Sequence, residues 1–194
     1  MIGAAFDSTL AAAVGGDELA FALLWRDVQP GLLRYLRVVA PGAAEDLASD
    51  TWVDVVRSLA RFRGGERSFR SWTFTIARHR AVDHQRHNGR RPADPVPTER
   101  MPERAAADDP AADAMEHIAT YHALALIAEL PRDQAEVVAL RVVAGLEVSQ
   151  VASIVGKRPG AVRVLAHRGL RRLAERLATG RPTPAGPGAG GVTR

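Results

Sequence analysis

The chain has 194 residues, which is enough for one domain or for two small ones. It contains no cysteine, and this excludes disulfide bonds, thiolate metal ligands and cysteine nucleophiles. The first residues lack a basic start and no run of about 18 apolar residues occurs, so we expect a cytoplasmic protein with neither a signal peptide nor direct membrane insertion.

The formal net charge of +4 is modest, but the charge is unevenly distributed along the chain. Residues 61–91 carry nine Arg against two acids, and residues 132–181 carry ten Lys and Arg against four acids. Between them, residues 94–116 carry seven acids against two Arg. Two basic blocks suggest two surfaces for a polyanion such as DNA, although on charge alone two solvated helical faces explain them equally well.

Residues 17–39 predict a first long helix. Apolar side chains recur at steps of three and four and would form one stripe along it: Phe21, Leu24, Val28, Leu32, Leu36 and Val39. Pro30 lies inside this pattern and should kink the helix, because proline donates no backbone hydrogen bond.

Two more helices are expected before residue 91. One follows Pro41, turns Leu47, Val55, Leu59 and Phe62 inward, and should stop at the glycine pair that begins with Gly64. The next should begin at Ser68, whose hydroxyl can accept a hydrogen bond from an early backbone N–H, and should run to about Asn88.

The rest of the chain begins with a predicted linker, because residues 92–112 contain five prolines mixed with charged residues and alanine. Helical periodicity resumes near Asp113. A short helix over 147–155, a turn and a longer helix over 160–177 predict a helix-turn-helix. Residues 180–194 are rich in Pro and Gly, so we expect them to be disordered.

The last helix of this pair is rich in basic side chains that lie off its apolar face. The early ones stand in the N-terminal turns, where recognition helices contact base edges in the major groove, and the later ones would contact phosphate. They are Arg163, His167, Arg168, Arg171 and Arg172. The alternative is a solvated amphipathic helix, but the preceding short helix and tight turn favour DNA binding.

The segment 68–91 combines aromatic rings with clustered Arg and His. Opening a duplex needs flat apolar surfaces on which unstacked bases can rest and cations for the separated strand, and this segment supplies both. Trp72 and Phe74 are equally well explained as core residues. Arg78, Arg80 and Arg86 are better assigned to phosphate, because burying that much charge without partners is costly.

Two other clusters of polar residues were considered, and neither indicates a metal site. His84 and His87 share one side of their helix while His79 lies well away, and no carboxylate stands at ligand spacing. Asp46, Asp50 and Asp54 recur every four residues opposite an apolar stripe, which indicates either a solvated face or an acidic docking surface. We therefore expect no metal and no cofactor.

Two stretches resemble bacterial sigma-70 family sigma factors of the extracytoplasmic-function (ECF, group 4) type. From Leu124 onward, LALIAELPRDQAEVVALRVVAGLEVSQVASIVGKRPGAVRVLAHRGLRRL resembles sigma region 4. In region 2, AAEDLASDTWVDVVRSLARFRG resembles the segment that grips the polymerase, and SFRSWTFTIARHRAVDHQRHNGRR resembles the segment that melts and reads the −10 promoter element.

The resemblance implies an all-α fold of two small helical domains, sigma region 2 and sigma region 4 with a helix-turn-helix, joined by a flexible linker. Region 2 would span 17–91, the acidic Pro-rich linker 92–112, region 4 113–179 and the disordered tail 180–194.

The resemblance also implies site residues. Those for the −35 element are Arg158, Arg163, Leu165, His167, Arg168, Arg171 and Arg172. Those for binding and melting the −10 element are Arg70, Trp72, Phe74, Arg78, His79, Arg80, Asp83 and Arg86. Those for polymerase binding are Asp46, Asp50 and Asp54.

Three positions depart from the family pattern. His79 stands where the family commonly has Asn in a pocket for a flipped base, and Glu147 replaces the usual Ser cap, which predicts a weaker helix start. Leu165 replaces an Arg or Lys near the DNA and would either touch a thymine methyl or rest against a neighbouring helix.

The implied function is that of a non-enzymatic specificity subunit of RNA polymerase. Its expected partners are core RNA polymerase, through the clamp coiled coil of the largest subunit and the flap region, promoter DNA, and an anti-sigma factor. The alternative is an autonomous helix-turn-helix transcriptional regulator, which would bind its operator tightly without polymerase. No nucleophile, carboxylate pair or metal constellation favours an enzyme.

Overall fold

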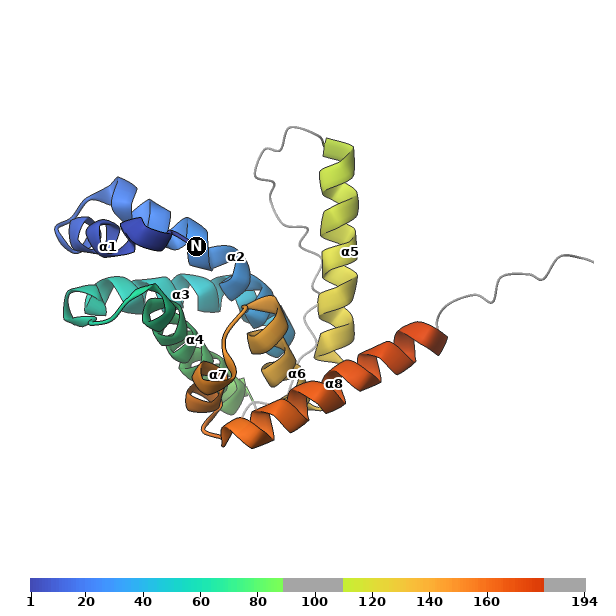
Figure 1. Ribbon diagram of the computed structural model, residues 1–194. Coiled ribbons are helices and arrows are strands. Elements are labelled where there is room, and N and C mark those ends of the chain that lie inside the picture. The colour runs from blue at the N-terminus through green and yellow to red at the C-terminus, as the bar shows by residue number, and fades with distance from the viewer. Residues whose placement is uncertain (89–109, 180–194) are drawn as a thin grey trace, which may run out of the picture.

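Helices form every regular element in the computed structural model, which describes residues 1–88 and 110–179 (Figure 1). The first stretch, the N-terminal unit, contains η1 (Gly3–Ala5), α1 (Phe6–Val14), α2 (Glu18–Val39), η2 (Pro41–Ala43), α3 (Ala44–Ser58), η3 (Leu59–Arg61) and α4 (Glu66–Asn88). The second stretch, the C-terminal unit, contains α5 (Pro110–Ala128), α6 (Arg132–Val138), the π-helical turn η4 (Ala139–Val143), α7 (Val148–Val155) and α8 (Pro159–Thr179). The all-α prediction is confirmed.

The core of the N-terminal unit is built on the predicted stripe of α2. Asp17 caps the helix, because its Oδ1 accepts hydrogen bonds from the backbone N–H of Leu19 at 2.9 Å and of Ala20 at 3.0 Å. Four stripe residues are almost completely buried: Leu24, Val28, Leu32 and Leu36. Pro30 lies within the same continuous helix. The periodicity therefore predicted both the extent of α2 and its buried face.

The boundary between α3 and α4 differs from the prediction. α3 ends at Ser58 and continues only as the turn η3, several residues before Gly64. α4 already begins at Glu66, and its first backbone bond runs from Phe69 N–H to the Gly65 carbonyl at 3.0 Å. Ser68 thus lies inside the first turn and is not the N-cap, so that prediction was wrong.

The C-terminal unit contains the predicted helix-turn-helix, formed by α7 and α8. Gly156 joins the two helices with φ +66°, a left-handed conformation that glycine adopts without a steric penalty. The Lys157 N–H donates to the Ala152 carbonyl at 3.0 Å and closes the end of α7. The start of α7 is stabilised by Gln150, whose side-chain oxygen accepts from the Glu147 N–H at 2.8 Å. We expected a weak start for this helix because Glu147 replaces the usual Ser. Gln150 supplies a side-chain hydrogen bond there.

Most of the predicted linker and the predicted disordered tail lie outside the described residues. The described chain resumes at Pro110 as the first residue of α5, three residues before the point where the sequence pattern indicated helix.

The two units pack against each other. α2 contacts α5, α6 and η4, while α4 contacts α7 (Figure 1). The approach is close at Gly31 of α2, where a Cβ would lie in ordinary van der Waals contact, 3.8 Å from the Cα of Ala144 and 3.7 Å from the Phe74 ring. The apolar residues of both units form one continuous cluster. The sequence did not predict this contact.

Candidate nucleic-acid and polymerase interfaces

Helix α8 presents its basic residues to solvent. Its inner face is fixed by Val162 and Gly169, which are both buried. The side chains on the other face are exposed, beginning with the residue that precedes the helix: Arg158, Arg163, His167, Arg168, Arg171 and Arg172. The packing of α8 therefore places six of the seven predicted −35 residues on solvent-exposed positions of one helix and its N-cap.

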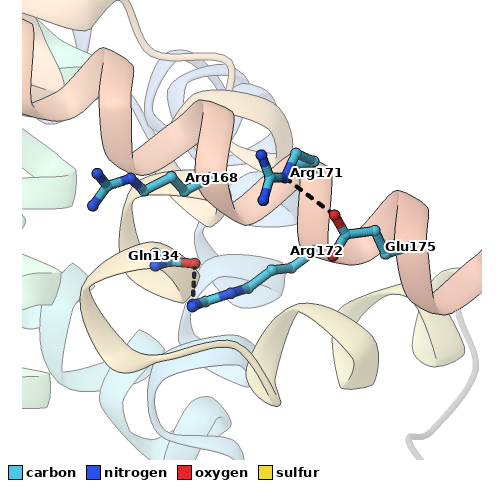
Figure 2. Close-up of a pocket in the computed structure, with 5 residues that line it drawn as sticks. All are labelled: Gln134, Arg168, Arg171, Arg172 and Glu175. Atoms are coloured by element: carbon cyan, nitrogen blue, oxygen red, sulfur yellow. Dashed lines mark hydrogen bonds and ion pairs between the residues drawn. The ribbon is translucent and has the colours of Figure 1, made fainter.

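Three of these arginines line a pocket of about 380 Å³ between α8 and α6, together with Gln134 and Glu175 (Figure 2). Arg172 Nη1 donates to Gln134 Oε1 at 2.9 Å, and Arg171 Nε lies 3.1 Å from Glu175 Oε1. An exposed pair four residues apart on a helix contributes only about 0.3–0.5 kcal/mol, so Arg171 can exchange it for a phosphate at little cost. The pocket has the charge and the donors to accept an anion.

Leu165 does not share this exposure. It is half-buried and packs against the core of the C-terminal unit. Of the two alternatives drawn from the sequence, the structure favours a neighbouring helix over a thymine methyl for this side chain.

The aromatic residues of α4 are mostly core residues. Phe69 and Phe74 are buried, and Phe74 packs edge-on against Tyr35 with 5.6 Å between the ring centroids. Phe74 therefore cannot receive an unstacked base in this structure, and the prediction for it is corrected to a core role. Trp72 is half-buried and lies against Phe62 with ring centroids 4.9 Å apart, so part of its surface remains accessible.

The arginines of α4 have carboxylate partners that the sequence analysis did not identify. Arg78 Nε lies 2.8 Å from Glu136 Oε1, and Arg80 Nη2 lies 2.5 Å from Asp54 Oδ2. The hydrogen bond that Arg80 donates to the Asp54 carboxylate raises the pKa of Arg80 above its ordinary value. Both arginines were predicted to contact phosphate, and in this structure a carboxylate occupies each of them.

Arg70 belongs to a third such pair, with 2.8 Å between Arg70 Nη1 and Asp27 Oδ2. Burial acts to raise the pKa of Asp27, but the hydrogen bond from the chain's amino terminus and the Arg70 guanidinium outweigh it and hold that pKa below its usual value. The pair is thus a fixed, charged feature of the N-terminal unit at neutral pH.

The C-terminal half of α4 is more open. His79, Asp83 and Arg86 are exposed, and Arg86 Nη1 lies 3.6 Å from Asp83 Oδ1. The predicted −10 residues are therefore divided between an exposed group and a group engaged in ion pairs or core packing.

The acidic residues of α3 differ in their exposure to solvent. Asp46 and Asp50 are exposed, whereas Asp54 is half-buried by its pair with Arg80. The same helix also carries Val53 and Val56, which are 45% and 55% exposed. These two valines were not predicted as site residues, although their position off the apolar stripe could have indicated them. An exposed face with both acidic and apolar residues is suited to protein docking.

Residues 1–88 and 110–179 were also searched for metal-binding clusters and for membrane-spanning helices. No group of three or more His, Cys, Asp or Glu lies close enough together there to bind a metal ion. None of the helices in these stretches is long and apolar enough to cross a membrane.

Comparison with known proteins identifies the family. Residues 24–91 match the family Sigma-70 region 2, and residues 123–173 match Sigma-70, region 4. The chain is 35% identical over 184 residues to the ECF RNA polymerase sigma factor SigD of Mycobacterium tuberculosis, covering 91% of this chain and 86% of the relative. The chain belongs to the ECF sigma factors. It is also 40% identical over 172 residues to the ECF RNA polymerase sigma factor ShbA of Streptomyces griseus, covering 83% and 89% of the two chains.

Solved structures support the same fold for this ECF sigma factor. CnrH, in complex with the cytosolic domain of CnrY, matches with a TM-score of 0.63 at 20% identity over 91% of this chain and 99% of that chain. The sigma factor RpoE of Bartonella quintana, in complex with the anti-sigma factor NepR, matches with a TM-score of 0.63 at 23% identity over 83% and 98% of the two chains. The sigma factor family consists of transcription initiation factors, and this member directs core RNA polymerase to −35 and −10 promoter elements.

Proposed function

We propose that the exposed basic face of α8 reads the −35 element of the promoters that this ECF sigma factor serves. The observation that carries the proposal is the helix-turn-helix itself, in which α7 and α8 meet at Gly156, and α8 together with the preceding Arg158 exposes six basic side chains to solvent. Arg163, His167 and Arg168 stand in the turns that enter a major groove, and Arg171 and Arg172 line the pocket suited to a backbone phosphate.

The −10 element is assigned to the exposed part of α4. His79, Asp83 and Arg86 are accessible there, and Trp72 keeps part of its ring surface available for stacking. Arg70, Arg78 and Arg80 belong to the same helix and contribute once their carboxylate partners are displaced, because phosphate competes for the same guanidinium donors.

Polymerase docking is assigned to α3. Asp46 and Asp50 supply exposed negative charge, and Val53 and Val56 supply apolar area. The acidic side chains would accelerate association with a basic surface, and the valines would contribute to affinity once buried. The proposed partner is the clamp coiled coil of the largest polymerase subunit, with the flap region contacting the C-terminal unit.

Three further features complete the proposal. The protein acts in the cytoplasm, where its polymerase and promoters are, and it catalyses no reaction itself. An anti-sigma factor is a partner, by analogy with the Bartonella quintana sigma factor, which was solved in complex with one. The domain boundaries are those given by the sequence, with 17–91 as region 2 and 113–179 as region 4.

The test is abortive transcription with purified core RNA polymerase on a pool of promoter fragments from the source genome. Wild-type protein should give promoter-dependent product, and Asp50→Arg and Arg168→Ala should each lose most of it, the first through polymerase binding and the second through −35 binding. Two exposed controls, Asp7→Arg on α1 and Arg176→Ala on α8, change the same charges outside the proposed surfaces and should retain activity.

The opposite result is equally informative. If wild-type protein gives no product with core polymerase but binds specific DNA alone, the chain acts as an autonomous regulator. If the controls fail as badly as the test variants, the loss reflects general charge or folding and the site assignments are wrong.

A further inference from the structure

The pocket between α8 and α6 has a polar floor, formed by Gln134. This side chain is only 7% exposed, and α8 comes close to it at Gly169, where an added Cβ would lie 3.5 Å from Gln134 Cβ. Its oxygen accepts a hydrogen bond from Arg172 at 2.9 Å, whereas its nitrogen has no acceptor in the described part of the chain. That nitrogen is still open to the pocket, because no fully buried side-chain nitrogen or oxygen of the described residues lacks a partner. The floor therefore offers a free hydrogen-bond donor.

The walls of the pocket come from one flank of α8. Arg168, Arg171, Arg172 and Glu175 stand three and four residues apart there, which places them side by side (Figure 2). Arg168 is exposed and bonds to none of the other residues that line the pocket. Arg171 has its exposed pair with Glu175, and Arg172 donates to a neutral amide. All three guanidinium groups can therefore turn to a ligand without leaving a buried carboxylate unpaired.

The charge of the pocket indicates which kind of anion fits. Its lining carries three positive charges against one negative charge, a net charge of +2. A phosphate diester of the DNA backbone has one negative charge and would neutralise half of this. A phosphate monoester has a charge of about −1.5 to −2 at neutral pH and three acceptor oxygens. It therefore matches the pocket better, both in charge and in the number of donors that it can satisfy.

The size of the pocket indicates what the phosphate is attached to. Its volume of about 380 Å³ exceeds the need of a bare phosphate and lies in the range of small-molecule sites, about 300–1,000 Å³. The remaining space borders Glu175, whose carboxylate accepts hydrogen bonds and suits hydroxyl groups. The five lining residues include no aromatic ring on which a nucleobase would stack. These features favour a phosphorylated sugar over a nucleotide.

We propose that this pocket is a regulatory site for a free sugar phosphate, whose phosphate monoester binds the three arginines and Gln134 and whose hydroxyl groups donate to Glu175. The inference rests on the proposed −35 role of α8, because the same three arginines are assigned to promoter DNA. A bound sugar phosphate excludes DNA from this part of α8. The affinity of the sigma factor for its promoters should therefore fall as the concentration of the ligand rises.

The first measurement is isothermal titration calorimetry on the full chain, with ribose 5-phosphate as the probe and the ionic strength held constant. Ribose 5-phosphate should bind saturably at one site. Inorganic phosphate lacks the hydroxyl groups that donate to Glu175 and should bind about tenfold more weakly, as expected for the loss of a hydrogen bond to a charged group. Ribose, which lacks the phosphate, should give no binding heat.

Arg168→Ala and Arg176→Ala form a matched pair of variants. Both remove an exposed arginine from α8, but Arg176 lies outside the pocket and pairs with Glu129 of α5. Arg168→Ala should weaken ribose 5-phosphate binding by about tenfold or more, whereas Arg176→Ala should leave it nearly unchanged. Gln134→Leu keeps the charge and the approximate size of the floor but removes its donor, so it should also weaken binding by about tenfold.

The second measurement is the apparent Kd of the holoenzyme, formed with core polymerase, for the promoter fragment selected in the transcription assay. Mutually exclusive binding predicts that ribose 5-phosphate at about ten times its own Kd raises this apparent Kd about elevenfold. Sodium sulfate at the same ionic strength is the control, because salt alone weakens DNA binding.

Three results would overturn the proposed site: no binding of ribose 5-phosphate, equal binding of inorganic phosphate, or equal losses in Arg168→Ala and Arg176→Ala. Binding at the pocket with unchanged promoter affinity would overturn its regulatory role. The proposed function fails separately. If the protein supports no transcription with core polymerase, the promoter measurement falls, while calorimetry on the free chain still decides whether the pocket binds a sugar phosphate.

Discussion

At Gly169, α8 packs closely against α6. A Cβ at this position would lie 2.7 Å from Val138 Cγ2, and Val138 is itself buried. Gly169→Ala should therefore destabilise the C-terminal unit by about 1–3 kcal/mol through overpacking, reduced by up to about 1 kcal/mol because alanine favours helix more than glycine. Chemical denaturation measures the change in the free energy of unfolding.

The matched control is Gly160→Ala in the same helix. A Cβ there meets no atom within 4 Å, so this substitution should leave the stability unchanged or raise it. Adding Val138→Ala to Gly169→Ala should relieve the overpacking. Equal stability of Gly169→Ala and Gly160→Ala would show that α6 moves aside freely.

The predictability of individual residues depended on how local their environment is. The exposed arginines of α8 followed from helical periodicity, because their environment is set by neighbours three and four residues away. The environment of Arg78 could not be predicted in this way, because its partner Glu136 lies 58 residues further along the chain. Phe74 and Trp72 are only two residues apart, yet packing by Tyr35 buries one completely and leaves the other half-buried, which the sequence alone could not decide.

At the scale of elements, the start of α7 depends on Gln150. Its side-chain oxygen accepts from the Glu147 N–H, and its side-chain nitrogen donates to the Arg67 carbonyl of α4. Gln150→Ala should cost about 1 kcal/mol, because it leaves the helix start without this side-chain bond and removes one link between the units. Thermal unfolding followed by circular dichroism measures the loss.

Ser153→Ala provides the comparison for this helix. Ser153 is exposed, and its hydroxyl bonds only to the Ser149 carbonyl one turn earlier, so its removal should be neutral or slightly stabilising. If both substitutions changed the melting temperature equally, the bonds of Gln150 would contribute nothing specific.

A helix start could be predicted from a capping residue only where the chain before that residue is not already helical. Asp17 precedes a long apolar stripe and caps α2. Ser68 carries a similar signal, but α4 begins two residues earlier, where the Gly65 carbonyl already accepts the first helical bond. A residue that can cap a helix does so only if the chain before it leaves the helical conformation, and that is decided by the preceding turn.

At the scale of the whole molecule, the sequence indicated two units but not their contact. The basic composition of α4 favoured a surface for DNA, and nothing local shows that part of this surface faces α6 and α7 instead. Such a contact arises from complementary pairs distant in sequence, such as Arg78 with Glu136 and Gln150 with Arg67. Each pair is modest, and their combination with the shared apolar cluster determines the arrangement.

Tyr35 links this arrangement to pH. Burial, and then the charge of Glu136, raise the pKa of Tyr35 well above its ordinary value. In the unfolded chain the phenol loses its proton near pH 10, whereas in the folded chain it keeps the proton to higher pH. The unfolded state therefore binds fewer protons above pH 10, so the contribution of Tyr35 to stability is complete below pH 10 and is lost as the pH rises towards its raised folded pKa.

The wild type should accordingly lose about 1.4 kcal/mol of unfolding free energy per pH unit above pH 10 relative to Tyr35→Phe, which has no phenol to ionise. Urea unfolding at pH 8, 10 and 11 measures the difference. Tyr121→Phe removes an exposed hydroxyl and should follow the wild type at each pH. Parallel pH curves for wild type and Tyr35→Phe would mean that water reaches the Tyr35 hydroxyl, and hence that the units are separated in solution. Since the same hydroxyl donates to Glu136, this comparison tests independently of DNA whether the two units are packed in the free protein.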